Sequence, residues 1–182
     1  AIEKLDHLAD LGINTIQLMP PIEFAGGFSW GYNPAQIFAI ETDYGGPCAL
    51  KKFIDAAHEL RIAVLFDVVY NHFGPTDLDL WQFDGWSEHS LGGIYFYNDW
   101  RAQTPWGHTR PNYGRLAVRQ YIRDNALMWL HDYRVDGLRW DATAYIRNAQ
   151  GQDNDPAHDI PDGWTLMQWI NDDIDAAHPE KI

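Results

Sequence analysis

Helical and strand-like hydrophobic patterns alternate along this chain of 182 residues, and this alternation limits its fold more than any other feature. Four segments repeat apolar residues three and four positions apart and are predicted helices: 2–9, 50–60, 118–133 and 166–177. Three short apolar runs between them are predicted strands: 15–19, 62–66 and 135–141. Regular alternation of this kind predicts β/α units around a parallel sheet, and therefore the α/β class.

Two connections are much longer than the others. Residues 20–48 and 68–116 exceed the ~12–15 residues above which a connection usually has a function or structure of its own. Both follow the carboxyl end of a predicted strand, where α/β folds place their chemistry. Both are rich in aromatic residues, most of which we expect to pack beneath the loops, while two or three can stack against sugar rings.

Charge and composition exclude several classes of partner. The chain has 13 Lys and Arg against 26 Asp and Glu residues, a formal net charge of −13. Phosphate binding needs an excess of basic side chains, so neither nucleic acid nor an anionic membrane surface is an expected partner. No apolar run approaches the ~20 residues that span a bilayer. One cysteine, Cys48, excludes an internal disulfide, and no glycine-rich phosphate loop indicates a nucleotide cofactor.

Polar clusters follow each of the three predicted strands: WGYNP (30–34), DVVYNH (67–72) and GLRWD (137–141). Alternate residues of a strand share a face, so Arg139 and Asp141 should point the same way. A guanidinium beside a carboxylate favours the ionised acid, which is the form that a glycosyl nucleophile needs. A buried structural ion pair is the alternative interpretation.

These segments together resemble a known family. DVVYNH (67–72) and DGLRWD (136–141) resemble the first two signature regions of the α-amylase family, glycoside hydrolase family 13, and WGYNP (30–34) resembles its substrate-stacking tyrosine loop. The resemblance covers essentially the whole chain. It implies a (β/α)8 TIM barrel, of which the chain would hold about strands 2–4 and helices 1–4. The implied domain is a partial catalytic barrel, 1–182, with 73–116 as an inserted loop or subdomain.

The resemblance implies a catalytic role for two residues. Asp141 aligns with the nucleophile that forms a covalent glycosyl-enzyme, and Arg139 aligns with the arginine that orients it. The expected substrate is an α-glucan or a maltooligosaccharide, cleaved with retention by a glycosidase or a glucanotransferase. The cytoplasm is the expected compartment, because glucan-storage enzymes work there.

Five further residues receive binding or structural roles by the same resemblance. Tyr32, with Trp30 beside it, aligns with the aromatic platform under the sugar, and His72 aligns with a histidine that hydrogen-bonds sugar hydroxyls. Asp67 aligns with an acid that braces the arginine, and Asn71 with a loop-holding residue that binds calcium in some amylases. Without the resemblance, His72 and Tyr32 would be interpreted as packing residues, and for Asp67 and Asn71 a structural role is preferred in any case.

No metal site is expected from the sequence. Asn71 would supply one oxygen ligand, whereas calcium takes six to eight. Six other histidines show no paired metal-ligand spacing and are interpreted as surface or packing residues: His7, His58, His89, His131, His158 and His178.

The second carboxyl group of a retaining glycosidase is not found. This general acid/base stands about 5–5.5 Å from the nucleophile, and in the family it is a Glu at the end of the next strand. The chain reaches Glu180 and Ile182 where that strand should begin. We therefore expect a piece of a longer enzyme, truncated on both sides and inactive alone. Its expected partner is the remainder of its own barrel, without which exposed strand edges favour self-association.

Two groups within the family share further segments with this chain. PNYGR (111–115) and the stretch 125–141 resemble α-1,4-glucan branching enzymes, the first expectation for activity. TPWG (104–107) and VYNHFGP (69–75) resemble maltooligosyl-trehalose trehalohydrolases, the alternative along with an α-amylase-type hydrolase. A non-catalytic relative that binds glucan or another protein is the alternative of another class, and the nucleophile–arginine pair speaks against it.

Overall fold

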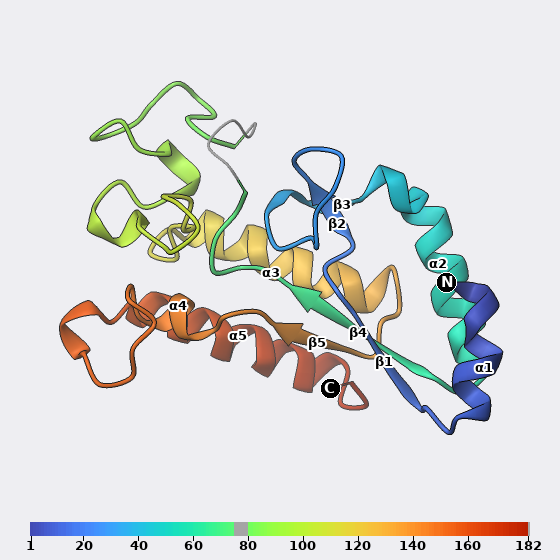
Figure 1. Cartoon of the computed structure of the whole chain (residues 1–182). Coiled ribbons are helices and arrows are strands. Elements are labelled where there is room, and N and C mark those ends of the chain that lie inside the picture. Colours follow the sequence, from blue (N-terminus) through green and yellow to red (C-terminus); the bar gives the residue numbers. More distant parts are fainter. Residues whose placement is uncertain (75–79, 182) are drawn as a thin grey trace.

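The computed structural model describes residues 1–74 and 80–181 (Figure 1). Pro75, in the segment that resembles trehalohydrolases, and Ile182 lie outside the described residues. The strands are β1 (Thr15–Leu18), β2 (Ile22–Phe24), β3 (Pro34–Ile40), β4 (Ala63–Val68) and β5 (Gly137–Trp140). The α-helices are α1 (Leu5–Asp10), α2 (Gly46–Glu59), α3 (Leu116–His131), α4 (Ala144–Arg147) and α5 (Pro161–Ala177). Short 3-10 turns occupy Ile2–Lys4, Thr42–Tyr44, Gly93–Tyr95, Trp100–Ala102 and Pro156–His158.

The three predicted strands form one parallel sheet in the order β1-β4-β5. On one face of its central strand, β4, Val64 and Phe66 are buried, whereas on the other face Ala63 and Leu65 are half-buried and Asp67 is buried. Strands of parallel sheets carry apolar residues on both faces, which is why its sequence pattern was distinctive. The prediction of β/α units around a parallel sheet is confirmed.

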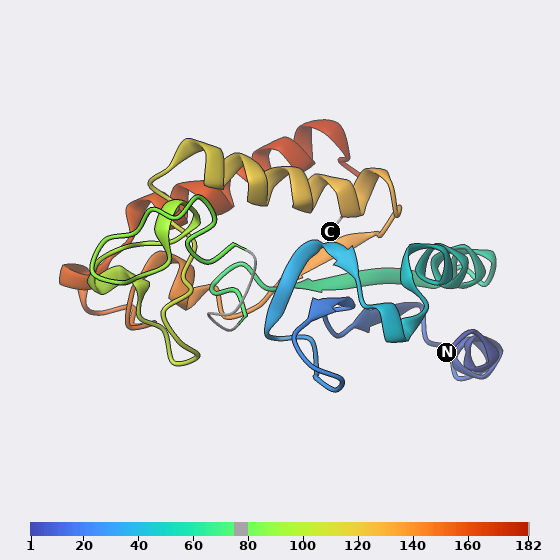
Figure 2. The same cartoon turned by 90° about the horizontal axis from the view of Figure 1, so that it is seen from above.

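Helices α3 and α5 lie side by side along one side of this sheet, and Figure 2 shows both above the strands. Trp129 of α3 packs against Phe66 of β4, with ring centroids 5.2 Å apart. The strands run toward a common edge, beyond which residues 80–115 and 141–160 gather (Figure 1). The parallel register therefore brings the ends of β4 and β5, with their polar residues, under the long loops.

The connection 20–48 differs from the expectation of a single long loop. It contains an antiparallel pair, β2 and β3, so the described residues hold five strands where the sequence indicated three. Burial along β3 falls on Pro34, Ile37 and Ile40, three residues apart, because the pairing with β2 is interrupted by register shifts. A period of three lacks the alternation by which strands are recognised.

The aromatic residues after β4 are part of the main hydrophobic core and do not form the separate core that the sequence indicated. Phe73, Phe96, Tyr97 and Tyr113 are buried there. Arg110 is also fully buried, and its guanidinium donates to the backbone carbonyls of Arg101, Gln103, Tyr145 and Ala149. Backbone carbonyls thus supply the hydrogen bonds of this buried cation. They tie the segment after β4 to the segment after β5.

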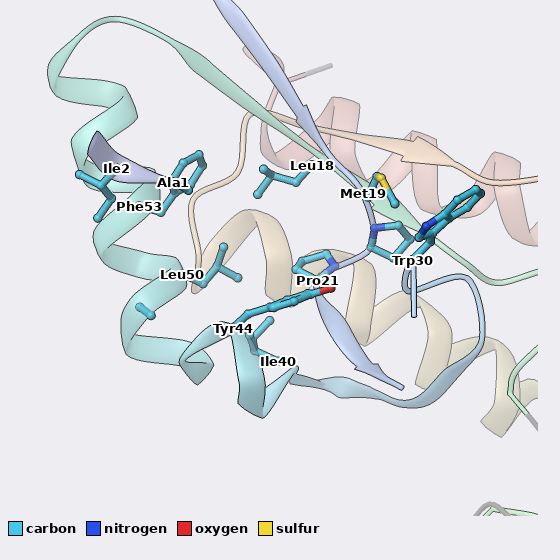
Figure 3. Close-up of a pocket in the computed structure, with 12 residues that line it drawn as sticks. Ala1, Ile2, Leu18, Met19, Pro21, Trp30, Ile40, Tyr44, Leu50 and Phe53 are labelled. Atoms are coloured by element: carbon cyan, nitrogen blue, oxygen red, sulfur yellow. The ribbon is translucent and has the colours of Figure 1, made fainter. Parts of the chain in front are cut away.

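An apolar cavity of about 430 Å³ adjoins β1, the strand at one end of the sheet. Leu18, Met19 and Pro21 line it together with Tyr44 and Leu50, and Figure 3 shows Met19 beside Trp30. The rest of the lining comes from Ala1, Ile2, Pro20, Trp30, Ile40 of β3, and Ala49 and Phe53 of α2. Among the described residues, no helix is long and apolar enough to cross a membrane.

Asn125 joins three parts of the fold inside the core. Its side chain Oδ1 accepts hydrogen bonds from the Tyr70 hydroxyl at 2.7 Å and from the Trp129 indole N–H at 3.1 Å. Its Nδ2 donates to the Ile37 carbonyl at 2.8 Å. A single buried amide on α3 therefore binds β3 and the segment that follows β4.

Replacing this amide should destabilise the fold strongly. Asn125→Ala leaves buried donors of Tyr70 and Trp129 without an acceptor, and each orphaned polar group costs about 1–3 kcal/mol. We expect the free energy of unfolding to fall by about 2–4 kcal/mol in a urea titration. Asn154→Ala, at an exposed position, is the control and should stay within about 0.5 kcal/mol of the parent. Equal effects of the two substitutions would contradict the role given to Asn125.

Candidate active site

Three charged side chains meet at the carboxyl ends of β4 and β5. Asp67 of β4 lies opposite Arg139 of β5 in the parallel register, and Asp141 follows β5 directly. Arg139 Nη1 donates to both Asp67 oxygens, at 2.8 and 2.7 Å, and to Asp141 Oδ1 at 2.8 Å. One guanidinium is thus shared by two carboxylates, as the spacing of Arg139 and Asp141 had indicated.

Asp67 is completely buried and is the anchor of this group. The Tyr32 hydroxyl donates to its Oδ2 at 2.7 Å, and the Gln17 amide of β1 reaches the same oxygen at 3.5 Å. Burial, together with the hydrogen bond to Asp67, raises the pKa of Tyr32 to about 12, so the phenol keeps its proton. Gln17 was not singled out in the sequence, where it was one polar residue of an apolar run.

Asn71 holds Asp141 from the other side. Its Nδ2 donates to the Asp141 backbone carbonyl at 2.9 Å and to the carboxylate Oδ2 at 3.2 Å. Its Oδ1 faces the His72 ring, with Nδ1 at 2.5 Å. Because the amide nitrogen is directed to Asp141, this oxygen is the group that accepts a proton from His72 Nδ1.

His72 lies in an aromatic stack that the sequence did not reveal. Its ring stacks on Trp106 with centroids 4.7 Å apart and planes 16° apart, and Trp106 meets Tyr145 edge to face at 5.2 Å. Burial is the main reason that the pKa of His72 falls to about 4, against the opposing attraction of Asp141. Trp106 lies in a segment noted for its family resemblance, and half of its surface remains exposed.

Trp30 lies apart from this group. It is 70% exposed and lines the apolar cavity beside β1, where Figure 3 places it next to Met19. None of the described hydrogen bonds or aromatic contacts links Trp30 to the Asp67–Arg139–Asp141 cluster. The structure thus brings together six of the seven residues singled out in the sequence.

Calcium does not fit the residues around Asn71. The side-chain oxygen of Asn71 already accepts from His72, and its amide nitrogen faces Asp141. Within 1–74 and 80–181, no group of three or more His, Cys, Asp or Glu side chains is arranged to hold a metal ion. The chemical groups available at the carboxyl ends of β4 and β5 are therefore the Asp141 carboxylate and the Arg139 cation that hydrogen-bonds it.

The sequence also matches a family model. The model of the α-amylase catalytic domain, "Alpha amylase, catalytic domain", matches residues 1–111, which is more than half of the chain. The chain belongs to the α-amylase family. The resemblance drawn from the three motifs is therefore confirmed, and with it the TIM-barrel fold class.

Curated relatives within the α-amylase family represent both groups recognised in the sequence. A malto-oligosyltrehalose trehalohydrolase of Rhizobium sp. strain M-11 is 43% identical over 81% of this chain and 23% of its own length. A 1,4-alpha-glucan branching enzyme of Corynebacterium efficiens is 41% identical over 79% of this chain and 19% of its own length. The chain thus spans about a quarter or less of these relatives.

A solved structure gives the same result for the fold. A Salmonella typhimurium protein classed with the alpha amylases superposes with a TM-score of 0.76 at 34% identity. The superposition covers 99% of this chain and 27% of that one. That structure therefore shares the arrangement of the described elements.

The depressed pKa of His72 predicts how stability changes with pH. An unfolded histidine titrates near pH 6.5, whereas folded His72 titrates at about 4. Between these values the unfolded state binds the extra proton, so the free energy of unfolding should decline as the pH falls from about 6.5 to 4. Above pH 6.5 the titration of His72 should no longer make the free energy of unfolding depend on pH.

Two measurements check this expectation. NMR titration of the imidazole should give a midpoint for His72 near pH 4, and the acid-induced loss of stability should be smaller in His72→Gln. His7→Gln, at an exposed site on α1, serves as the control and should leave the pH profile unchanged. A midpoint near 6.5 for His72 would contradict the burial argument.

Proposed function

We propose that the whole protein is a retaining enzyme of α-glucan metabolism in which Asp141 is the nucleophile. The observation that carries the proposal is the double restraint of the Asp141 carboxylate, one oxygen accepting from Arg139 and the other from Asn71. The side chain is 17% exposed, so a substrate can reach it while most of its surroundings are protein. A positioned, partly desolvated carboxylate is what formation of a glycosyl-enzyme requires.

Arg139 orients the nucleophile in this proposal, and Asp67 orients Arg139. The hydrogen bond to Asp67 raises the pKa of Arg139 above its already high value, so the cation is permanent. Because Asp67 is buried and engaged by Arg139 and Tyr32, it serves as the fixed end of the chain of contacts. Asp67 is therefore a positioning residue rather than a second catalytic acid.

The sugar-binding surface in this proposal consists of His72, Tyr32 and Trp106. Neutral His72, whose Nδ1 faces Asn71, is proposed to hydrogen-bond a sugar hydroxyl. The exposed half of Trp106 provides an aromatic face for a neighbouring sugar ring. Trp30, which lines the separate apolar cavity, is proposed as a more distant contact for the glucan chain.

The general acid/base has no candidate among the contacts of Asp141 in residues 1–74 and 80–181. Among the described residues, Arg139 contacts two carboxylates, Asp67, which is buried and already engaged, and Asp141 itself. Loss of a positioned general acid costs about 10²–10⁴-fold in rate. We therefore propose that residues 1–182 alone have no appreciable turnover, and that the whole protein supplies the acid.

The remainder of the barrel is also the proposed partner for the edge strand β1 and the apolar cavity beside it. A strand paired on one side leaves backbone groups and apolar surface for another segment to cover. Self-association of the isolated chain is the proposed consequence when that segment is missing. The proposed compartment is the cytoplasm, where glucan-storage enzymes work.

The molecule that accepts the glycosyl group from the enzyme decides between the two candidate activities. In both, Asp141 displaces the leaving sugar and forms the same covalent intermediate. Transfer to a 6-hydroxyl of another glucan makes a branch, and attack by water releases a hydrolysis product. The branching interpretation follows the PNYGR segment, and the trehalohydrolase interpretation follows the Thr104–Gly107 segment, whose Trp106 stacks on His72.

Incubation of the whole protein with amylose and with a maltooligosyl-trehalose tests the function. New α-1,6 linkages identify a branching enzyme and released trehalose identifies a trehalohydrolase. Asp141→Asn should lower kcat on the active substrate by about 10⁴–10⁶-fold, the range for loss of a catalytic group that acts in a unit. Asp172→Asn, on the exposed face of α5, should not change it. Glucan binding without turnover of either substrate would instead indicate a non-catalytic relative.

A further inference from the structure

Arg110 is a buried cation that the proposed reaction does not use. Its side chain is fully buried. Burial lowers the pKa of its guanidinium, although an arginine keeps its charge in proteins. In the part of the chain that the structure describes, no carboxylate forms an ion pair with Arg110. A buried charge without a counter-ion is costly, so a cation at this place calls for a physical reason.

The guanidinium of Arg110 joins two segments that meet beyond the edge of the sheet (Figure 1). In the segment after β4, Nε donates to the Arg101 carbonyl at 2.6 Å and Nη2 to the Gln103 carbonyl at 2.7 Å. In the segment after β5, Nη2 donates to the Ala149 carbonyl at 2.8 Å and Nη1 to the Tyr145 carbonyl. The planar fork of a guanidinium serves both segments at once, which the single nitrogen of a lysine does not.

Tyr145 connects this buried cation to the candidate sugar-binding surface. Its backbone carbonyl accepts from Arg110, and its ring meets Trp106 edge to face, with centroids 5.2 Å apart. Trp106 in turn stacks on His72. Gly151 confines the Tyr145 ring on another side, because an added Cβ at this glycine would lie 2.6 Å from the ring. A displacement of the Tyr145 backbone would therefore disturb the stack of Trp106 on His72.

We propose that Arg110 is a positioning residue for sugar binding, which holds Tyr145 against Trp106 and thereby keeps Trp106 stacked on His72. This inference rests on the proposed function, in which Trp106 and His72 belong to the sugar-binding surface. Half of the Trp106 surface is exposed, so contacts on its buried side must fix the ring. A ring that is held before the sugar arrives loses less conformational freedom on binding than a mobile one.

The charge of Arg110 also acts on His72. Burial lowers the pKa of His72 most, and the positive charge of Arg110 lowers it further, whereas Asp141 and a hydrogen bond to the Tyr32 backbone raise it. A second cation is unfavourable beside a permanent one, so His72 stays neutral. A buried arginine at this place therefore supports both the position of the stack and the charge state of its histidine.

NMR of the whole protein with isotope-labelled histidine tests the proposal without any need for turnover. The proton signals of the His72 ring are assigned by their loss in His72→Gln. An indole stacked on this ring shifts them upfield, and Trp106→Leu shows where they lie without the stack. In Arg110→Lys, which has one nitrogen in place of three, and in Arg110→Met, the His72 signals should move toward those of Trp106→Leu. Arg123→Met, which removes an arginine of α3, is the control and should leave them unchanged.

The midpoint of the His72 titration separates the charge of Arg110 from its hydrogen bonds. Arg110→Met should raise this midpoint above the parent value of about 4, and Arg110→Lys should raise it less, because a cation remains. His72 signals that stay at the parent positions in folded Arg110→Lys would overturn the proposal and leave Arg110 with a structural role alone. This variant decides the matter even where Arg110→Met fails to fold.

Kinetics of the whole protein give an independent readout. On the substrate that it turns over, Arg110→Lys should raise KM by about tenfold with a smaller change in kcat, because Trp106 contacts a sugar beside the one that Asp141 attacks. An unchanged KM would contradict the positioning role. A parent protein without turnover would count against the proposed function, whereas the His72 signals would still decide the role of Arg110.

Discussion

The contact on which the candidate site depends is the guanidinium of Arg139 shared between Asp67 and Asp141. Asp67 is buried without access to water, and a carboxylate in that position must be paired and hydrogen-bonded. Arg139 provides the pairing and, with the same Nη1, also holds Asp141 in place. The same guanidinium that pairs with buried Asp67 therefore also orients Asp141, which a substrate can reach.

This arrangement follows from the register of the parallel sheet. Asp67 and Arg139 are direct partners across β4 and β5, so the two side chains emerge at the same level of the sheet edge. A shift of the register by one residue would send one of them to the other face. The packing of Phe66 against Trp129 and the hydrogen bonds of Asn125 to β3 and to the segment after β4 hold β4 under α3 and keep that register.

The sequence predicted the parts of the fold and site that depend on local periodicity or on short motifs. The apolar run of β4 and the spacing of Arg139 and Asp141 are examples, because strand geometry alone relates their side chains. The hairpin of β2 and β3 was missed, since register shifts give its burial a period of three. The stacking of Trp106 on His72 was missed for another reason: the two residues lie far apart in the chain, and no local pattern encodes their contact.

The central claim is that Asp141 forms a covalent bond to the sugar, and mass spectrometry can test it directly. The whole protein, treated with a 5-fluoro-α-glucosyl fluoride to slow breakdown of the intermediate, is digested and its peptides are sequenced. The account predicts that the glycosyl mass is carried by the peptide that contains DGLRWD, on Asp141 itself. Labelling of a different carboxylate, or inactivation without any label on that peptide, would contradict the account.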